Sequence, residues 1–382
     1  MSESTVSKTK YPFKADTVGS LLRPDKLKKA YFDFDKGNIS LRDLEKIENV
    51  EINRIVKKQV DLGLKTITDG EFSRRHFLLD FLAGLNGVKK IPKADKVQFK
   101  NKTITNDRLE LEDRISYNPN HSFFKSFKYL KSIVPKETTP KLTIPSPTPA
   151  LIQHRNFALI RNWADFYKKR SQYLDDLVQA YRKSILHFYK LGARYIQLDD
   201  PFWPYLIQGF NQTKNNQNEY SKFTKLADEF TSVTKRIISN LPSDLVLTTH
   251  ICRGNFKSTY LFSGGYKPVI KYLKQLPFDA FFLEYDNFSQ DGDFSPLTEF
   301  YQTQPKAVFV LGIVTSKFPN LESKGYLKQE IKKASQYVPL DHLALSTQCG
   351  FASTQEGNDL TEDQQWKKLK LVVDTAKEIW KN

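Results

Sequence analysis

The sequence predicts an α/β protein of the (β/α)8 TIM barrel class. Short β-branched and aromatic segments alternate with amphipathic helical patterns along the chain, and each short segment finishes in a polar residue, Gly or Pro. A strand followed by a helix, repeated eight times, is typical of a closed parallel barrel. Active sites in this architecture lie at the carboxyl ends of the strands, so functional residues are expected there.

Eight segments have the composition of barrel strands. In chain order they end near TVGS (17–20), KTITDGEF (65–72), LTIPSP (142–147), RYIQLDDP (194–201), LVLTTHIC (245–252), FFLEYD (281–286), VFVLGIVTS (308–316) and LALSTQCG (343–350). Patterns with apolar residues every three or four positions predict helices at 41–63, 163–192, 221–241, 267–276, 321–338 and 361–380.

We expect a single domain over residues 1–382. Its first part, 1–12, is predicted to be a flexible tail, and the region 80–140 interrupts the alternation of strands and helices. In that region KVQFKNKTITNDRLELEDRISYN predicts a hairpin and FFKSFKYLKSI a short helix. We interpret 80–140 as an insertion between strands 2 and 3 that caps the barrel mouth, with packing alone as the alternative role.

The composition argues against several classes of protein. A net charge of +16 invites a nucleic-acid interpretation, but the lysines are dispersed along helices and interleaved with acids, which is typical of a solvated surface. A basic rim would still attract a polyanionic substrate. Two cysteines are too few for a disulfide framework, and no apolar run approaches the roughly 20 residues that span a bilayer. We therefore expect a cytoplasmic protein with reduced thiols, no nucleic-acid or membrane partner, and a homodimer as a candidate assembly.

A histidine and both cysteines of the chain stand at predicted strand ends. His250 and Cys252 are two positions apart, so on a strand their side chains point to the same face. Zinc prefers Cys, His and Asp or Glu in a tetrahedral set, and Cys349 and Glu284 would complete that set if their strands converge at the mouth. The alternative is that the cysteines are two small buried hydrophobic residues, because the usual CxxC pair is absent.

The strand ends taken together resemble a known family. TVGSLLRP, TDGEFSRR, IPSPTP, YIQLDDP, THICRGN, LEYD, LGIVTSK and LSTQCGFAS are similar to the catalytic barrel of the cobalamin-independent methionine synthase family, in its short single-barrel form. The resemblance runs from about residue 14 to the C-terminus. The long enzymes of the family carry an additional N-terminal barrel that helps to bind the folate, and no segment of this sequence corresponds to it.

The resemblance implies a role for each strand end. It implies that zinc is bound by His250, Cys252, Glu284 and Cys349, that the backbone amides of Val18, Gly19 and Ser20 hold the substrate carboxylate, and that Glu71 and Asp199 bind the substrate ammonium. Glu284, Asp199 and Glu71 are thus the expected catalytic residues. Simpler roles stay open: Glu71 as a helix cap, one acid of the Asp199 and Asp200 pair as a loop acid, and Trp203 as core filling instead of a stacking surface for a pterin.

The implied activity is methyl transfer from 5-methyltetrahydrofolate, including polyglutamylated forms, to homocysteine, as in methionine biosynthesis. Zinc would keep the homocysteine sulfur deprotonated, and Glu284 is the ligand expected to yield when sulfur enters. The leaving nitrogen must be protonated. Where the long enzymes have a histidine on the seventh strand, this chain has Thr315 or Ser316, which are not useful acids; His76 is a substitute candidate, with a packed or surface role as the alternative.

Three other functions are compatible with the same residues. The zinc site could transfer an alkyl group from another donor, such as a methylcorrinoid protein, an S-methyl compound or a small electrophile. It could instead be a zinc hydrolase or deaminase in which Glu284 acts as base on a water molecule. The third is a basic binding protein without chemistry.

Overall fold

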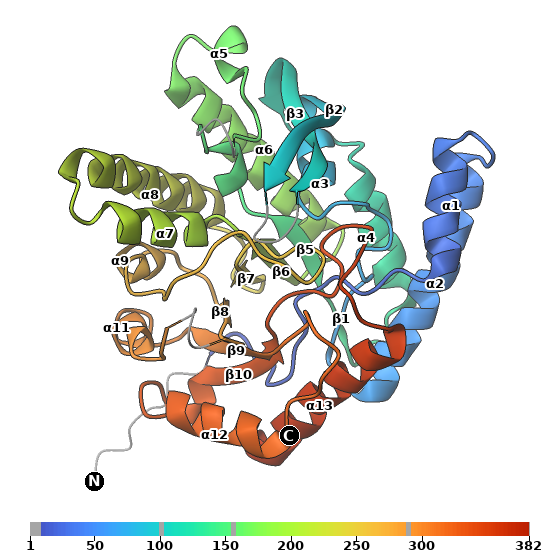
Figure 1. The fold of residues 1–382 in the computed structure, drawn as a ribbon. Helices are drawn as coiled ribbons and strands as arrows, with labels where there is room; N and C mark the ends of the chain where they lie inside the picture. The colour runs from blue at the N-terminus through green and yellow to red at the C-terminus, as the bar shows by residue number, and fades with distance from the viewer. Residues whose placement is uncertain (1–8, 99–102, 154–157, 288–291, 382) are drawn as a thin grey trace.

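The computed structural model describes residues 9–98, 103–153, 158–287 and 292–381. Its centre is a parallel six-stranded sheet in the order β10-β9-β8-β7-β6-β5, with helices around it (Figure 1). The strands are β5 (Leu142–Pro145), β6 (Tyr195–Asp199), β7 (Val246–Ile251), β8 (Ala280–Glu284), β9 (Val308–Val314) and β10 (Leu343–Thr347). The predicted α/β class and the last six predicted strands are confirmed.

The first two predicted strands are shorter than expected. Residues 65–72 contribute only β1 (Thr66–Ile67), which pairs with β4 (Thr139–Pro140), and Lys141 N–H donates to the Ile67 carbonyl at 2.9 Å. No strand is assigned at 17–20; the chain instead forms one parallel bridge between Ala15 and Leu345 of β10. The reason is local. The Thr17 N–H donates to the side chain of its neighbour Asp16 at 2.7 Å and so does not donate to an adjacent strand.

One buried carboxylate joins this first segment to the other side of the sheet. Asp16 accepts hydrogen bonds from the hydroxyls of Tyr11 and Tyr195 at 2.7 Å each and from Thr66 at 2.6 Å. Lys141 adds an ion pair at 3.3 Å, and both charged side chains are fully buried. Since the same segment bonds to β10 while these partners lie on or beside β1, β5 and β6, the network holds the two ends of the six-stranded sheet together.

Each of the six predicted helical ranges contains a helix, and the structure adds helices at Asp25–Asp35, Trp203–Thr213 and Pro296–Thr303 that were not predicted. The structure has α1 (Asp25–Asp35), α2 (Leu41–Leu62), α5 (Trp163–Phe166), α6 (Arg170–Lys190), α7 (Trp203–Thr213), α8 (Gln217–Ile238), α9 (Ile270–Leu273), α11 (Pro296–Thr303), α12 (Lys324–Ala334) and α13 (Glu362–Trp380). The predicted helix at 163–192 is divided between α5 and α6. Tyr167 is extended there because its hydroxyl accepts a hydrogen bond from Ile115 N–H at 2.6 Å and donates one to Asp176 at 3.1 Å.

The region 80–140 contains the expected hairpin and helix. Strands β2 (Asn86–Gln98) and β3 (Thr103–Ser116) are antiparallel, α3 (Leu79–Ala83) precedes them and α4 (Ser122–Ile133) follows. Figure 1 shows the hairpin standing beside α3 and α6. The salt bridge of Arg114 with Asp176 at 2.9 Å fixes β3 against α6.

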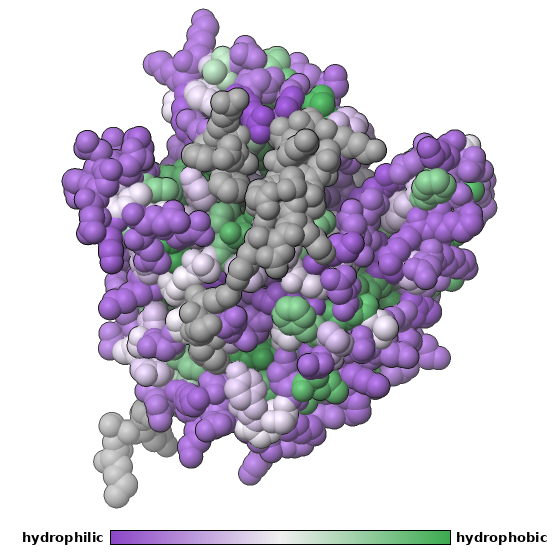
Figure 2. All heavy atoms as spheres, in the orientation of Figure 1, coloured by the Kyte–Doolittle hydropathy of each residue, from purple (hydrophilic) through white to green (hydrophobic). Residues whose placement is uncertain are grey.

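Hydrophilic residues dominate the face of the molecule in Figure 2, where hydrophobic ones show as separate patches. This agrees with the expected solvated, lysine-rich surface. Among the helices within the described ranges, none combines the length and the apolar character that a bilayer crossing requires.

Replacing Asp16 tests the network that joins the sheet ends. We expect Asp16→Ala to lower the free energy of unfolding by about 3–5 kcal/mol, because it leaves the buried Lys141 ammonium unpaired. Urea unfolding measures the loss. Asp25→Ala, at a fully exposed carboxylate, is the control and should change the unfolding curve little. Equal curves for the two variants would contradict the role given to Asp16.

Candidate metal centre and active site

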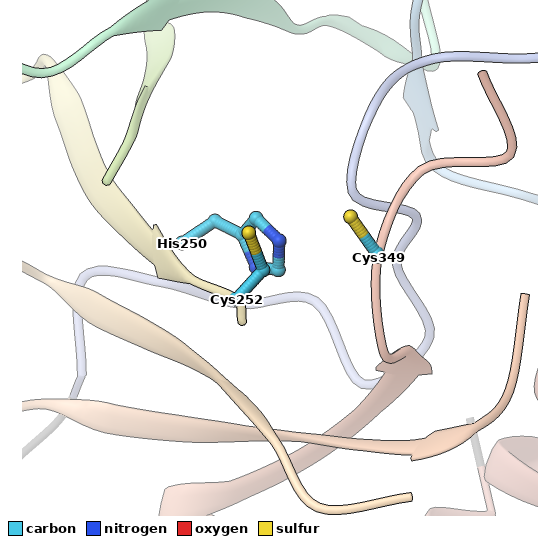
Figure 3. Close-up of side chains that lie close together, drawn as sticks. All are labelled: His250, Cys252 and Cys349. Atoms are coloured by element: carbon cyan, nitrogen blue, oxygen red, sulfur yellow. The ribbon is translucent and has the colours of Figure 1, made fainter. Parts of the chain in front are cut away.

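Three buried side chains with metal-binding atoms meet at the carboxyl ends of the parallel strands. His250 is in β7, Cys252 directly follows that strand, and Cys349 stands on the loop after β10. Their ligand atoms all lie within 4.8 Å of one another. In Figure 3 the Cys349 sulfur points across the space toward the other two side chains. Because β8 and β9 separate β7 from β10 in the sheet, only a strongly curved sheet brings these ends together.

A close approach of two loops positions Cys349. The next residue, Gly350, lies against Ser20, and a Cβ at that glycine would be 2.0 Å from the Ser20 Oγ. Ser20 also accepts the Phe351 N–H on its carbonyl at 2.9 Å and the Ala352 N–H on its hydroxyl at 3.2 Å. The loop after β10 is therefore held to the TVGS segment, and the substitution of Gly350 by any larger residue would move the thiol.

The chemistry of these three residues fits a metal ion. Both ring nitrogens of His250 are buried and have no hydrogen-bond partner among the described residues. The nearby Cys349 thiol, and then His250, lower the pKa of Cys252 well below its ordinary value although burial opposes this. The same proximity raises the pKa of Cys349. Unsatisfied buried nitrogens are costly, and two Cys with one His plus an open position is a ligand set of catalytic zinc.

Glu284, expected as the fourth ligand, is not part of this group. Its carboxylate accepts hydrogen bonds from the backbone N–H of Arg253 at 2.9 Å, from the Asn255 amide at 2.8 Å and from the Lys317 ammonium at 2.8 Å. Although burial opposes it, Lys317 with Arg253 lowers the pKa of Glu284. The carboxylate is thus ionised and held by three donors.

His250, Cys252 and Cys349 face a pocket of about 1120 Å³, part of it open to solvent. Of the other predicted site residues, Val18, Ser20, Glu71 and Asp199 line it. Asp107 of β3 also lines it, so the region 80–140 reaches the pocket. The remaining wall is largely apolar and includes Phe77, Leu78, Phe202, Phe256, Leu261 and Phe262.

The TVGS segment presents free backbone amides. The N–H groups of Gly19 and Ser20 make no hydrogen bond to any other described residue. Gly19 has φ 155°, and a Cβ there would be 2.7 Å from the Thr143 methyl group and 3.2 Å from Glu71. The absence of a side chain at this position therefore lets the turn pack directly on Glu71. Unpaired amides in such a turn are suited to an anion.

Glu71 is a buried site residue rather than a solvated acid or a helix cap. Its φ of 63° is unusual for a residue with a side chain, and Asp69 supports the turn by accepting the Glu71 N–H at 2.8 Å. The carboxylate forms an ion pair with Arg74 at 2.7 Å and accepts a hydrogen bond from Thr143 at 3.0 Å. Backbone strain of this kind is concentrated at functional sites.

The adjacent acids of LDDP have different surroundings. Burial, with a contribution from Glu71, raises the pKa of Asp199 to about 7 against the opposing effect of His250. Asp200 accepts hydrogen bonds from the Thr148 hydroxyl at 2.6 Å and from the Phe202 N–H at 3.2 Å. Asp200 is therefore the loop acid of the pair, and Asp199 is the one in the pocket.

Trp203 lies in the core and not in the pocket wall. It is 1% exposed and packs edge-on against Phe230, with ring centroids 5.7 Å apart. A pterin could not stack on an indole enclosed in this way, so the core-filling alternative holds. Its neighbour Phe202 lines the pocket instead.

The candidates for the acid are placed differently from one another. Thr315 and Ser316 do not line the pocket among the described residues; the Ser316 hydroxyl donates to Gln348 at 2.7 Å. His76 does line it, and its Nδ1 accepts the N–H groups of Leu78 at 3.2 Å and Leu79 at 3.3 Å. Burial lowers the pKa of His76 to about 4, so near neutral pH the ring is uncharged and carries its hydrogen on Nε2.

Sequence reasoning missed three residues that support the site: Lys317, Arg74 and Asn255. Arg74 pairs with Glu71, and both Lys317 and Asn255 bind Glu284. A signal was present for two of them, because Arg74 is three positions after Glu71 and Lys317 directly follows a predicted strand end. Asn255 lies in a loop after HIC and has no such signal.

Residues 13–378 match the family model of the cobalamin-independent synthase catalytic domain. The chain belongs to the cobalamin-independent methionine synthase family. It is 40% identical to YxjG and 39% to YxjH, two uncharacterised proteins of Bacillus subtilis, over 99% of this chain and 98% of each relative. It is 23% identical to the 5-methyltetrahydropteroyltriglutamate–homocysteine methyltransferase of Buchnera aphidicola, over 94% of this chain but only 42% of that protein.

Solved structures agree with this family assignment. A structure described as a candidate vitamin-B12-independent methionine synthase of Listeria monocytogenes is 36% identical, with a TM-score of 0.73 over 97% of this chain and 98% of that one. A B12-independent methionine synthase of Shewanella sp. W3-18-1, solved with selenomethionine, is 17% identical with a TM-score of 0.70 over the same shares. The second likeness supports the fold alone.

The protonation state of His76 can be measured directly. We expect nitrogen NMR to show an Nε2-protonated neutral ring whose titration midpoint is about 4, because the charged form would lose solvation and would repel the two N–H groups on Nδ1. His76→Asn assigns the resonance. A midpoint near the ordinary value of about 6.5 would contradict this arrangement.

Proposed function

We propose that this family member is a zinc-dependent S-methyltransferase that moves a methyl group from 5-methyltetrahydrofolate, including polyglutamylated forms, to homocysteine and so forms methionine. The single observation that carries the proposal is the buried group of two thiols and one imidazole facing a pocket that also has free amides and two carboxylates. A thiol-bearing amino acid has a group that complements each of these: its thiol for a metal on the thiols and imidazole, its carboxylate for the amides, and its ammonium for the carboxylates.

His250, Cys252 and Cys349 would hold the zinc ion. When bound, zinc lowers the pKa of a substrate thiol and keeps its sulfur nucleophilic at neutral pH. The protein's own residues contribute burial, since the three ligands are 2%, 7% and 4% exposed in that order. Water is thereby largely excluded from the ligand atoms, which strengthens every electrostatic interaction there.

The amino-acid end of homocysteine would lie between the TVGS turn and the two acids. The N–H groups of Gly19 and Ser20 donate to the carboxylate, and Glu71 and Asp199 accept from the ammonium. Arg74 fixes the position of the Glu71 carboxylate for this role through the ion pair at 2.7 Å. These contacts would fix one end of the substrate so that its sulfur is directed to the thiol-rich end of the pocket.

The methyl donor would occupy the apolar part of the pocket. Phe202, Phe256 and Phe262 offer faces for a flat ring system. His76 can donate a hydrogen bond from Nε2 toward the leaving nitrogen, although a pKa of about 4 makes it a poor proton reservoir. The net charge of +16 would favour the approach of a glutamate tail.

A second candidate keeps the thiol acceptor and changes the donor to a methylcorrinoid protein or an S-methyl compound. One observation favours it: among the described residues neither Thr315 nor Ser316 lines the pocket, so neither supplies an acid there. A hydrolase with Glu284 as base is disfavoured, because that carboxylate does not line the pocket within the described residues.

Cys349→Ser tests the metal centre. We expect purified variant protein to retain well under one zinc per chain and to lose methyl transfer, because an alcohol is a far weaker zinc ligand than a thiolate. Metal analysis and a methionine assay measure the two effects, and circular dichroism checks that the fold is kept. Full zinc content together with full activity in this variant would defeat the assignment.

A panel of methyl donors tests the reaction itself. Zinc-loaded protein with homocysteine should form methionine from 5-methyltetrahydrofolate and its triglutamate. Methylcobalamin and S-methylmethionine are the comparison donors, and product from these alone would favour the second candidate. X-ray absorption at zinc, with and without homocysteine, should show an added sulfur neighbour; no added sulfur would exclude both transferases.

A further inference from the structure

A strained turn in the loop after β7 begins at an aromatic residue of the pocket wall, Phe256. The Phe256 N–H donates to the Thr259 carbonyl at 2.9 Å, and the Thr259 N–H donates to the Phe256 carbonyl at 2.8 Å. Between them Lys257 has φ 41° and Ser258 has φ 62°. A two-residue turn with positive φ at both positions strongly favours Asn-Gly, because most side chains are disfavoured in this conformation. Contacts from outside the turn must therefore hold it.

Ser258 makes those contacts. Its hydroxyl donates to the Lys317 carbonyl, in the segment after β9, at 2.6 Å. The same hydroxyl accepts the Asp359 N–H, in the segment after β10, at 2.9 Å. The Ser258 N–H donates to the Asn358 side chain at 3.0 Å, and the Asn358 amide group donates to the Ser316 carbonyl at 2.8 Å. One serine thus ties the loop after β7 to the segments that follow two other strands.

Phe256 lies between two anchors of its loop. At the base, the Arg253 N–H and the Asn255 amide donate to the Glu284 carboxylate at 2.9 Å and 2.8 Å. At the tip, the loop is held by the contacts of Ser258. The Phe256 side chain is 9% exposed and lines the pocket. The two anchors fix the backbone on both sides of Phe256, and so fix the direction of its ring.

The location of the strain connects the turn to the pocket. Five residues other than glycine have positive φ in the described part of the chain. One of them, Glu71, lines the pocket, and two more, Lys257 and Ser258, directly follow a residue that lines it. Backbone strain persists where the surrounding structure over-determines the conformation, and it is concentrated at functional sites.

We propose that Ser258 is a positioning residue for the methyl donor: it holds the strained turn so that the ring of Phe256 forms the surface against which the flat ring system of the donor lies. This inference rests on the proposed function, which places the donor in the apolar part of the pocket. Ser258 does not line the pocket itself, so it acts through Phe256.

A positioning role and a purely structural role differ in how the effects of substitutions combine. If Ser258 acts through Phe256, removing its hydroxyl weakens donor binding only while the aromatic ring is present. A serine that merely stabilises the loop would have the same effect whichever side chain stands at position 256. Residues that act as one unit show strongly non-additive effects, whereas independent residues show additive ones.

The experiment measures two affinities in Ser258→Ala, Phe256→Leu and the double variant. Isothermal titration calorimetry with the monoglutamate form of 5-methyltetrahydrofolate, and separately with homocysteine, gives the dissociation constants. We expect Ser258→Ala to weaken donor binding about tenfold, through the loss of two hydrogen bonds that hold the turn, and to leave homocysteine binding unchanged. The double variant should bind the donor no more weakly than Phe256→Leu alone. In the methyl-transfer assay, KM for the donor should rise by the same factor while kcat stays the same.

A second variant removes the other contact of the turn from outside its loop. Asn358→Ala deletes the acceptor of the Ser258 N–H and should weaken donor binding in the same direction, again only while Phe256 is present. Ser239→Ala is the matched control, because it also removes a serine hydroxyl that donates to a carbonyl at 2.6 Å, that of Lys235, and Ser239 does not line the pocket. It should change neither affinity.

Each outcome decides the inference. Unchanged donor affinity in Ser258→Ala, an equal loss for donor and homocysteine, or additive effects with Phe256→Leu overturns the positioning role while the proposed function stands. Loss of the folded state in both Ser258→Ala and Asn358→Ala, seen by circular dichroism, also overturns it, because the contacts then serve the fold. Failure of the unaltered protein to bind 5-methyltetrahydrofolate is a different result, which defeats the proposed donor and this inference with it.

Discussion

The carboxylate of Asp16 is the constraint on which the site depends. It joins the segment around Ala15, which bonds to β10, to Thr66 of β1, Lys141 beside β5 and Tyr195 of β6. A six-stranded parallel sheet has two open edges, and this network draws them toward each other. The end of β10 is thereby placed opposite the end of β7, and two cysteines that are far apart in the chain come to face one space. A group with five partners and no exposure is costly to disturb, so the curvature is firmly set.

The same geometry explains why the pocket is chemically divided. Strand ends supply the polar part, with His250, Cys252 and Cys349, the TVGS amides and the two acids, whereas loops supply Phe77, Leu78, Phe256 and Phe262. Strand ends are held by the sheet ladder, so they keep ligand atoms within a few ångströms of one another. Loop residues carry less of that constraint and can vary more than the strand ends.

Much of this arrangement was predictable from the sequence, and the failures have physical causes. The polar ends of apolar segments indicated the location of the site, because parallel strands all present their carboxyl ends at one rim. His250, Cys252 and Cys349 meet as that rule requires. Glu284 also lies at the rim, but its carboxylate is bound by Lys317 and Asn255. A pattern of strand ends does not predict which side chains pair with one another. The prediction that Trp203 stacks on a pterin was wrong for a related reason. A shift of one position along the chain decides whether a side chain points to the pocket or to the core, and here Phe202 lines the pocket while Trp203 lies in the core.

Charge pairing distinguishes Asp199 from three other buried acids, Glu71, Glu284 and Asp16. Glu71 is neutralised by Arg74, Glu284 by Lys317, and Asp16 by Lys141, each through an ion pair. Asp199 has no ion-pair partner among the residues that the structure describes; it accepts only from the Gln197 amide at 2.7 Å, and its pKa is raised to about 7. An incoming ammonium would supply the missing positive charge and favour the ionised form. Of these four acids, Asp199 is therefore the one whose ionisation should respond most to the ammonium of the proposed substrate, because the other three already have ion-pair partners.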